Sequence, residues 1–245
     1  MGARLKICGL MRPEDVALCC EAGADMLGFV TEYPHPVPWN LTRDQTRALL
    51  AGVRRPARSC VVTGGAAEAI IDLALALLPD AVQLHAGETL QDTARVVQAL
   101  APRGIRIIKT LPMSAEDRLA QLGQRDPARC AALLVDAGVS AILVDSRSPT
   151  RAGGPGQPVD LDFYRWVQAA SPLPVILAGG VTPENAPALL SQVRPPWLDV
   201  MTGVETAPGR KDPDKVRALA AAVRAHAAQG GRPSSHPVPR TGWTI

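Results

Sequence analysis

The sequence predicts an α/β protein built as a single (β/α)₈ barrel, the TIM-barrel architecture. Eight short apolar runs alternate along the 245 residues with longer segments of helical periodicity. Near-continuous apolar strands in such an alternation are typical of a parallel sheet that is buried on both faces. Eight strand–helix units in one domain-sized chain favour closure into a barrel. An open doubly wound sheet, the structural alternative, would need no eighth unit.

The expected elements follow this rhythm along the chain. We expect strands at residues 4–8, 25–30, 58–63, 81–85, 105–109, 141–145, 174–178 and 198–201. We expect helices at 13–22, 43–52, 66–78, 89–100, 115–137, 160–170, 183–192 and 212–227. Pro13, Pro183 and Pro213 lie near the first turns of three of these helices with acidic residues close behind, which is typical of helix starts.

Two segments depart from the rhythm. Residues 110–140 are more than one helix needs, and Asp126-Pro127 is expected to divide them. The last stretch, 229–245, is rich in Gly, Pro and Ser and predicts a disordered tail. We therefore expect one barrel domain over residues 1–228.

Composition excludes several classes of function. The net charge is only +3 and no basic tract is present, while two Tyr and two Phe offer few surfaces for stacking bases, so nucleic acid is not expected as a partner. No signal-like segment or membrane-length apolar run occurs, so a cytoplasmic protein without a membrane partner is expected. Five cysteines without a CxxC pair, and no cluster rich in acids or histidine, argue against a disulfide framework and against a metal site.

A thiol and a carboxyl group stand where this fold places catalytic residues, at the C-terminal ends of strands. Cys8 ends the first expected strand and Asp145 ends the sixth. Two such groups facing one cavity can act as base and acid if their environments separate their pKa values. Taken singly, Cys8 would be assigned as a buried packing thiol, and Asp145 could equally be a structural loop carboxylate or a catalytic one. The other four cysteines are expected to be packing thiols.

Glycines follow the last two expected strands. Gly179 and Gly180 come after strand seven, and Thr202 and Gly203 come after strand eight. Glycine lets backbone N–H groups approach an anion closely, and barrels often bind phosphate between these two loops. Each glycine group alone is typical of a turn, but the two in successive loops favour a phosphate site. Gly154 and Gly156, after strand six, are candidates for a lid or a further wall of the same site.

The positions of four more polar residues in the sequence indicate where they lie in the barrel. His85 ends strand four, where a hydrogen-bonded structural histidine and a catalytic one are equally compatible with the sequence. Asp25, Asp80 and Asp199 precede or open strands, so they are expected at the opposite rim of the barrel, in roles that support stability.

With Cys8, Asp145 and the glycine loops in these positions, the chain resembles the phosphoribosylanthranilate isomerase family of tryptophan biosynthesis. The matching stretches run in the family's order from the first strand to the last helix. They are KICGLMRPEDVALCCEAGADMLGFV (6–30), DAVQLHAGE (80–88), ILVDS (142–146), GGPG (153–156), VILAGGVTPENAPALL (175–190) and DVMTGVETAPGRKDPDKVRAL (199–219). The first and the last two form a specific combination, whereas any one of them alone would be a weaker match.

The resemblance implies an Amadori rearrangement without a cofactor, on a small phosphorylated sugar-amine substrate. N-(5-phosphoribosyl)anthranilate would become 1-(2-carboxyphenylamino)-1-deoxyribulose 5-phosphate. By the resemblance, Asp145 is the general acid that protonates the ribose ring oxygen, and Cys8 is the base that removes the C2′ proton. Backbone amides around Gly179, Gly180, Thr202 and Gly203 would hold the phosphate.

The segment after strand two departs from the family pattern. The family commonly has a serine-proline-arginine run there, whose arginine pairs with the anthranilate carboxylate, and our alignment puts Trp39 at that position. An ion pair would be lost and an aromatic surface gained. Arg43 or Arg147 is a candidate replacement for the missing cation.

Smaller departures are Pro155 and Gln157, where the family usually has threonine and lysine, and Met201, which replaces a small polar residue. We expect Trp39, His85, Gly154 and Gly156 to bind the substrate.

Three functions remain open on the sequence. The leading one is phosphoribosylanthranilate isomerase activity, in a monomer or a homodimer. The second is the same chemistry on another phosphoribosylamine or sugar phosphate, which Trp39 motivates. The third is a non-catalytic protein that binds a phosphorylated ligand, and the presence of both Cys8 and Asp145 argues against it, because mere binding needs neither.

Overall fold

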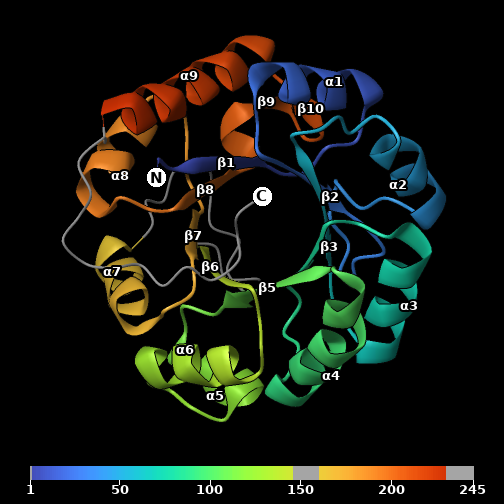
Figure 1. Cartoon of the computed structure of the whole chain (residues 1–245), viewed down its shortest axis with the longest axis vertical. Helices are drawn as coiled ribbons and strands as arrows, with labels where there is room; N and C mark the ends of the chain where they lie inside the picture. The colour runs from blue at the N-terminus through green and yellow to red at the C-terminus, as the bar shows by residue number, and fades with distance from the viewer. Residues whose placement is uncertain (1, 146–159, 230–245) are drawn as a thin grey trace.

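A computed structural model describes residues 2–145 and 160–229, and its centre is a closed barrel of eight parallel strands (Figure 1). Each strand pairs with the next along the chain, and β8 pairs with β1 to close the ring. The strands are β1 (Arg4–Ile7), β2 (Met26–Val30), β3 (Arg58–Thr63), β4 (Ala81–Leu84), β5 (Arg106–Leu111), β6 (Ala141–Asp145), β7 (Val175–Ala178) and β8 (Trp197–Val200). The predicted fold is confirmed.

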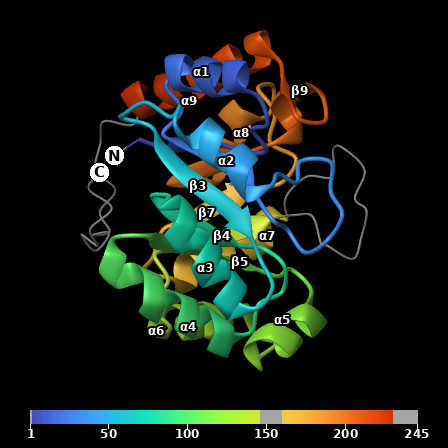
Figure 2. The ribbon, with the colours of Figure 1, turned by 90° about the vertical axis from the view of Figure 1, so that its right-hand side faces the viewer.

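Helices form a ring around the outside of the barrel (Figures 1 and 2). They are α1 (Pro13–Ala22), α2 (Arg43–Leu50), α3 (Ala67–Leu77), α4 (Leu90–Leu100), η1 (Ala101–Arg103), α5 (Ala115–Leu122), α6 (Pro127–Asp136), α7 (Leu161–Ala170), α8 (Ala186–Val193) and α9 (Pro213–Gln229). None of these described helices is long and apolar enough to span a membrane. Residues 230–245, most of the expected tail, lie outside the described part of the chain.

The division of the long segment between β5 and β6 agrees with the sequence. It holds two helices, α5 and α6, and the Asp126 side chain accepts a hydrogen bond of 2.8 Å from the Arg129 N–H at the start of α6. Pro127 occupies the first turn, where its missing N–H costs no hydrogen bond. Two features were not predicted: the short 3₁₀-helix η2 (Thr202–Val204) and the antiparallel pair β9 (Glu205–Ala207) and β10 (Arg210–Lys211).

Strand alternation separates an outer core from the barrel interior. In β8, Leu198 and Val200 pack outward against the helices, whereas Trp197 and Met201 pack with the inner cluster. In β1, Leu5 and Ile7 face outward in the same way. This period of two places Lys6 and Cys8 inside the barrel.

The opposite rim holds two of the three aspartates expected there. Asp25 accepts a hydrogen bond of 2.8 Å from the Leu5 N–H, and Asp80 accepts one of 2.8 Å from the Ser59 N–H. The prediction for Asp199 was wrong. It is the third residue of β8, and its side chain lies inside the barrel, opposite Lys6 of β1 in the strand register. The sequence prediction began this strand at residue 198 instead of 197. It therefore treated Asp199 as a residue at the start of the strand and missed that its side chain points inward.

Candidate active site

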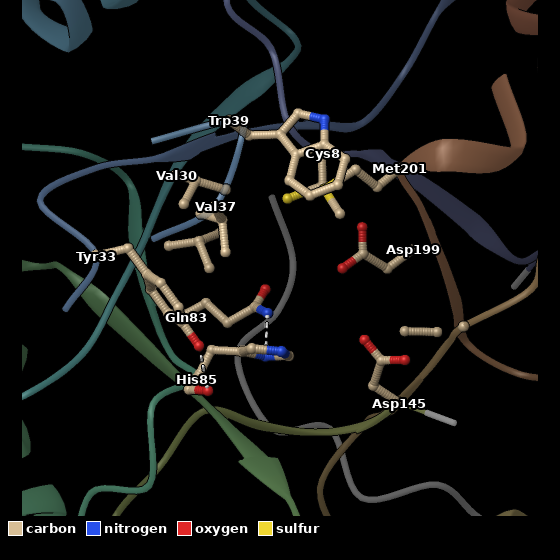
Figure 3. A pocket seen from close by; sticks show the side chains of 13 residues that line it. Cys8, Val30, Tyr33, Val37, Trp39, Gln83, His85, Asp145, Asp199 and Met201 are labelled. Atoms are coloured by element: carbon tan, nitrogen blue, oxygen red, sulfur yellow. Dashed lines mark hydrogen bonds between the residues drawn. The ribbon is translucent and has the colours of Figure 1, made fainter. Parts of the chain in front are cut away.

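A cavity of about 200 Å³ opens at the C-terminal ends of the strands (Figure 3). Its walls come from residues that end or follow β1, β2, β3, β4, β6, β7 and β8, and from the segment after β2. They are Cys8, Val30, Tyr33, Val37, Trp39, Val62, Gln83, His85, Asp145, Ala178, Gly179, Asp199 and Met201. The cavity therefore lies where this fold places its active sites.

Cys8 follows β1 directly and is buried in the cavity wall, with 6% of its surface exposed. Gly28 of β2 makes room for it, because a Cβ at residue 28 would lie 2.7 Å from the Cys8 Sγ. Burial raises the pKa of the Cys8 thiol, and the nearby Lys6 ammonium opposes that rise. A thiol in such a place can act as a base only to the extent that its surroundings stabilise the thiolate.

Lys6 and Asp199 form a buried ion pair next to Cys8. The Lys6 Nζ lies 2.6 Å from the Asp199 Oδ2, and both side chains are almost completely removed from solvent. The other carboxylate oxygen, Oδ1, is buried and has no hydrogen-bond partner among the described residues. Asp199 also contributes to the lining of the cavity.

Asp145 ends β6, and its half-buried side chain points into the cavity from a wall other than that of Cys8 (Figure 3). His85 follows β4 and lines the same space. Its Nδ1 lies 2.8 Å from the Thr110 Oγ1 and 3.3 Å from the Gln83 Nε2. Although part of His85 opens into the cavity, burial among its neighbours lowers its pKa, and Asp145 partly opposes this, so the ring is neutral at neutral pH.

The wall beside Cys8 is apolar and contains the largest departure from the family pattern. Trp39 and Met201 both line it, and both lie within 3.1 Å of where a Cβ on Gly9 would be. The Trp39 Nε1 donates a hydrogen bond of 3.0 Å to the Glu205 Oε1. That carboxylate also pairs with the buried Lys211 at 2.8 Å, so the indole is fixed at its polar edge.

The two glycine loops meet at the mouth of β7 and β8. Gly179 lines the cavity, and Gly179 and Gly180 both adopt positive φ, at 86° and 61°. A Cβ on Gly203 would lie 1.9 Å from the Val181 carbonyl oxygen, so only glycine allows the loop of Thr202 and Gly203 to pack this closely on the loop after β7. Backbone groups of both loops are thus brought together beside the cavity.

The sequence-predicted site residues are distributed as follows. Cys8, Asp145, Trp39, His85 and Gly179 all line the one cavity. Gly180, Thr202 and Gly203 adjoin it through the two loops. Gly154 and Gly156 lie outside the described residues, as do Arg147, Pro155 and Gln157.

Arg43 does not supply the missing cation, because its guanidinium bonds Glu32 and Asp72 on the surface and is not part of the cavity wall. Among the described lining residues there is no lysine and no arginine.

Sequence reasoning missed Asp199, Lys6 and Gln83 as members of this site. Each is a charged or amide side chain within an otherwise apolar strand, and this was the available signal. For Lys6 and Gln83, the alternation of side chains along the strand also turns them to the same face as Cys8 and His85. Within residues 2–145 and 160–229, no group of three or more His, Cys, Asp and Glu side chains is arranged to hold a metal ion.

Known proteins are similar to this chain in sequence and architecture. A family model described as N-(5′-phosphoribosyl)anthranilate (PRA) isomerase matches residues 5–222. The N-(5′-phosphoribosyl)anthranilate isomerase of Haloferax volcanii is 36% identical over 222 residues, which cover 90% of this chain and 93% of that protein.

Two solved structures extend the comparison. The crystal structure of phosphoribosyl anthranilate isomerase from Thermotoga maritima has a TM-score of 0.74 at 27% identity, covering 91% of this chain and 99% of that one. A structure of the isomerase with reduced 1-(o-carboxyphenylamino)-1-deoxyribulose 5-phosphate has a TM-score of 0.69 at 26% identity, with the same coverage. The resemblance seen in the sequence is confirmed: the chain belongs to the N-(5′-phosphoribosyl)anthranilate isomerase family.

Proposed function

We propose that the cavity isomerises N-(5′-phosphoribosyl)anthranilate, with Asp145 as the general acid and Cys8 as the general base. The observation that supports this most directly is that the two groups, 137 residues apart in the chain, line one cavity from β6 and β1 (Figure 3). Family membership supplies the reaction, and the geometry supports the assignment of its two proton transfers to these residues.

The chemistry runs in a fixed order. Asp145 gives its proton to the ribose ring oxygen, and the C1′–oxygen bond breaks to leave a protonated imine. That cation acidifies the C2′ hydrogen, so the Cys8 thiolate is a sufficient base to remove it. The resulting enolamine then tautomerises to the 1-deoxyribulose ketone. No redox cofactor takes part, because the oxidation at C2′ balances the reduction at C1′.

The phosphate of the substrate is assigned to the loops after β7 and β8. Backbone N–H groups around Gly179, Gly180, Thr202 and Gly203 would bind it, as the close approach of the two loops permits. With the phosphate there, the sugar would lie across the mouth of the barrel, with its reacting carbons near Cys8 and Asp145. His85 and Trp39 are then left to contact the remainder of the substrate.

The experiment for this proposal separates chemistry from binding. Cys8→Ala and Asp145→Asn should each lower kcat by at least about 10²-fold, because general acid–base groups contribute about 10²–10⁴-fold. Consumption of the fluorescent substrate measures kcat. Titration of each variant with the reduced product analogue should give a Kd similar to that of the wild-type protein. Near-normal kcat in either variant would contradict the assigned role.

A second candidate is the same reaction on a phosphoribosylamine whose aromatic ring lacks the carboxylate. The observation that favours it is the wall beside Cys8, where Trp39 and Met201 offer apolar surface and no described lining residue is cationic. The ratio of kcat/KM for the anthranilate and aniline derivatives distinguishes the two. A large preference for the anthranilate derivative would remove this candidate.

The assembly state is a separate proposal. One relative from Thermotoga maritima is described as a dimeric phosphoribosylanthranilate isomerase, and we infer a monomer or a homodimer for this chain. Light scattering of the purified protein measures its mass directly. A trimer or a larger assembly would contradict the inference.

A further inference from the structure

The buried ion pair at the base of the cavity has a feature that stability alone does not explain. The Lys6 Nζ and the Asp199 Oδ2 are 2.6 Å apart, with 0% and 8% of their side chains exposed. The carboxylate nevertheless leaves its Oδ1 without a hydrogen bond among the described residues. Buried ion pairs are costly to desolvate and often stabilise a fold less than apolar packing would, so an incompletely bonded pair in a cavity wall points to a role in the site.

The charge of Lys6 is secure in this environment. Burial lowers the pKa of Lys6, but Asp199, Cys8 and Cys60 together raise it above its ordinary value. A protonated lysine has three N–H donors, and the ion pair with Asp199 uses only one of them. Cys8 follows Lys6 by two residues, so both side chains lie on the inner face of the barrel, and the Lys6 charge acts on the Cys8 thiol. The ammonium therefore connects the carboxylate to the thiol.

Cys8 needs such a neighbour. Burial raises the pKa of its thiol, and this is the strongest influence on it. Lys6 is the strongest opposing influence, through its charge, while Asp199 reinforces the rise and Lys211 also opposes it. The Lys211 Nζ bonds the Cys8 carbonyl oxygen at 2.6 Å and the Glu205 carboxylate at 2.8 Å, so its charge is largely compensated elsewhere.

We propose that the Lys6–Asp199 pair is the positioning device of the base: the Lys6 ammonium stabilises the Cys8 thiolate, and Asp199 holds the ammonium in place. This rests on the proposed function, in which Cys8 is the base. When the thiolate takes the C2′ proton it becomes neutral, and Lys6 keeps its own proton throughout. The pair therefore prepares the base and is not consumed.

The arrangement also accounts for which thiol ionises. Cys60 of β3 lies near the same lysine, but it is fully buried, does not line the cavity, and burial raises its pKa to about 12. Three other titratable groups, Tyr33, His85 and Asp145, line the cavity. His85 is neutral and contributes no charge, and Asp145 approaches from β6.

The test measures the ionisation of Cys8 without using catalysis. The rate of iodoacetamide alkylation at the Cys8 peptide, followed by mass spectrometry across pH, gives the pKa of this thiol separately from the other four. In Lys6→Met with Asp199→Asn, which removes both charges at nearly constant shape, this pKa should rise, because the Lys6 charge acts on the thiol more strongly than the opposing Asp199 charge does. Alkylation below neutral pH should slow about tenfold for each unit of that rise.

A single substitution should move the thiol the other way. Asp199→Asn keeps an acceptor for Lys6 but removes the negative charge, so the pKa of Cys8 should fall. If the Lys6–Asp199 pair had a purely structural role, the pKa of Cys8 would not shift in opposite directions in Asp199→Asn and in the folded double variant. The acid limb of the kcat/KM profile should move in the same direction as the alkylation profile in each variant.

The matched control is a different buried ion pair, that of Lys109 and Glu88. Lys109→Met with Glu88→Gln removes a pair of similar burial that does not line the cavity, and it should leave the Cys8 alkylation profile unchanged. An unchanged profile in Lys6→Met/Asp199→Asn, or equal shifts in both double variants, would overturn the proposal. If Cys8→Ala retained isomerase activity, the assignment of Cys8 as the base would be wrong. The alkylation result would still decide whether Lys6 stabilises the Cys8 thiolate.

Discussion

Two of the buried lysine–carboxylate pairs, Lys109 with Glu88 and Lys6 with Asp199, differ in how many of their polar atoms form hydrogen bonds. Lys109 and Glu88 are 2.7 Å apart between β5 and the loop after β4, and Lys6 and Asp199 are 2.6 Å apart between β1 and β8. The Glu88 Oε1 also accepts hydrogen bonds from the Ala86 N–H at 3.0 Å and the Gly65 N–H at 3.3 Å. Lys109 has a second acceptor, the Gln121 Oε1, at 3.3 Å.

Asp199 has no such second partner for its Oδ1 among the described residues. The Glu88 pair holds loops together and does not line the cavity, whereas Asp199 lines the cavity next to the Cys8 thiol. Two ion pairs that are similarly buried and similarly charged therefore have different roles. The difference teaches that the role of a buried ion pair is better inferred from the polar atoms that it leaves without hydrogen bonds than from its burial.

The largest effect we expect from breaking this contrast is on stability. Lys109→Met leaves the Glu88 carboxylate buried and unpaired, so the free energy of unfolding should fall by about 3–5 kcal/mol. The kcat of the folded enzyme should stay the same, because neither residue lines the cavity. Urea denaturation and kcat on the same preparation check both statements.

Glu88→Gln added to Lys109→Met provides the control, since it removes the unpaired charge and should restore much of the lost stability. A fall in kcat with unchanged unfolding free energy would contradict the structural role given to this pair.

A smaller effect is expected at the cavity itself, where packing sets the position of the thiol. Gly28→Ala places a Cβ 2.7 Å from the Cys8 Sγ and 3.1 Å from the Cys8 Cα, so the thiol or its backbone must move. The free energy of unfolding should fall by about 1–3 kcal/mol, and kcat should fall with it because the base is displaced from Lys6.

The sulfur can be removed to test this explanation. In a Cys8→Ala background the same Gly28→Ala change should cost less stability, with a coupling of about 0.5–3 kcal/mol between the two positions. Equal costs in both backgrounds would show that the strain does not come from Cys8.

The smallest expected effect is confined to a pH window. Because burial lowers the pKa of His85 in the fold, the unfolded chain binds a proton at a higher pH than the folded chain does. The stability that His85 contributes is therefore present above about pH 6.5 and is lost as the pH falls through its lower, folded pKa.

His85→Gln should reduce the slope of the unfolding free energy against pH below about pH 6.5. His35 is exposed, so His35→Gln is the matched control and should leave the slope as it is in the unchanged chain. Identical slopes in all three proteins would mean that His85 is not held neutral by the fold.

Much of the fold was accessible from the sequence because its signals are local. Apolar runs of strand length, helix-start prolines and the divider Asp126-Pro127 each act within a few residues, and the observed elements match them closely. Cys8, Asp145 and His85 could be selected as candidates because the ends of parallel strands meet at one rim. The hairpin of β9 and β10 was not predictable in this way, since its strands have only three and two residues.

By itself, then, the sequence determined eight strand–helix units, the rim at which chemistry-bearing residues gather, and the family. Only the tertiary structure decided that Lys6 meets Asp199 across 193 residues and that both lie beside Cys8. The physical reason is closure: the register between β1 and β8 is set when the last strand completes the ring, and it brings two charges from opposite ends of the chain to the same level of the barrel. Patterns within a single segment carry no information about that register.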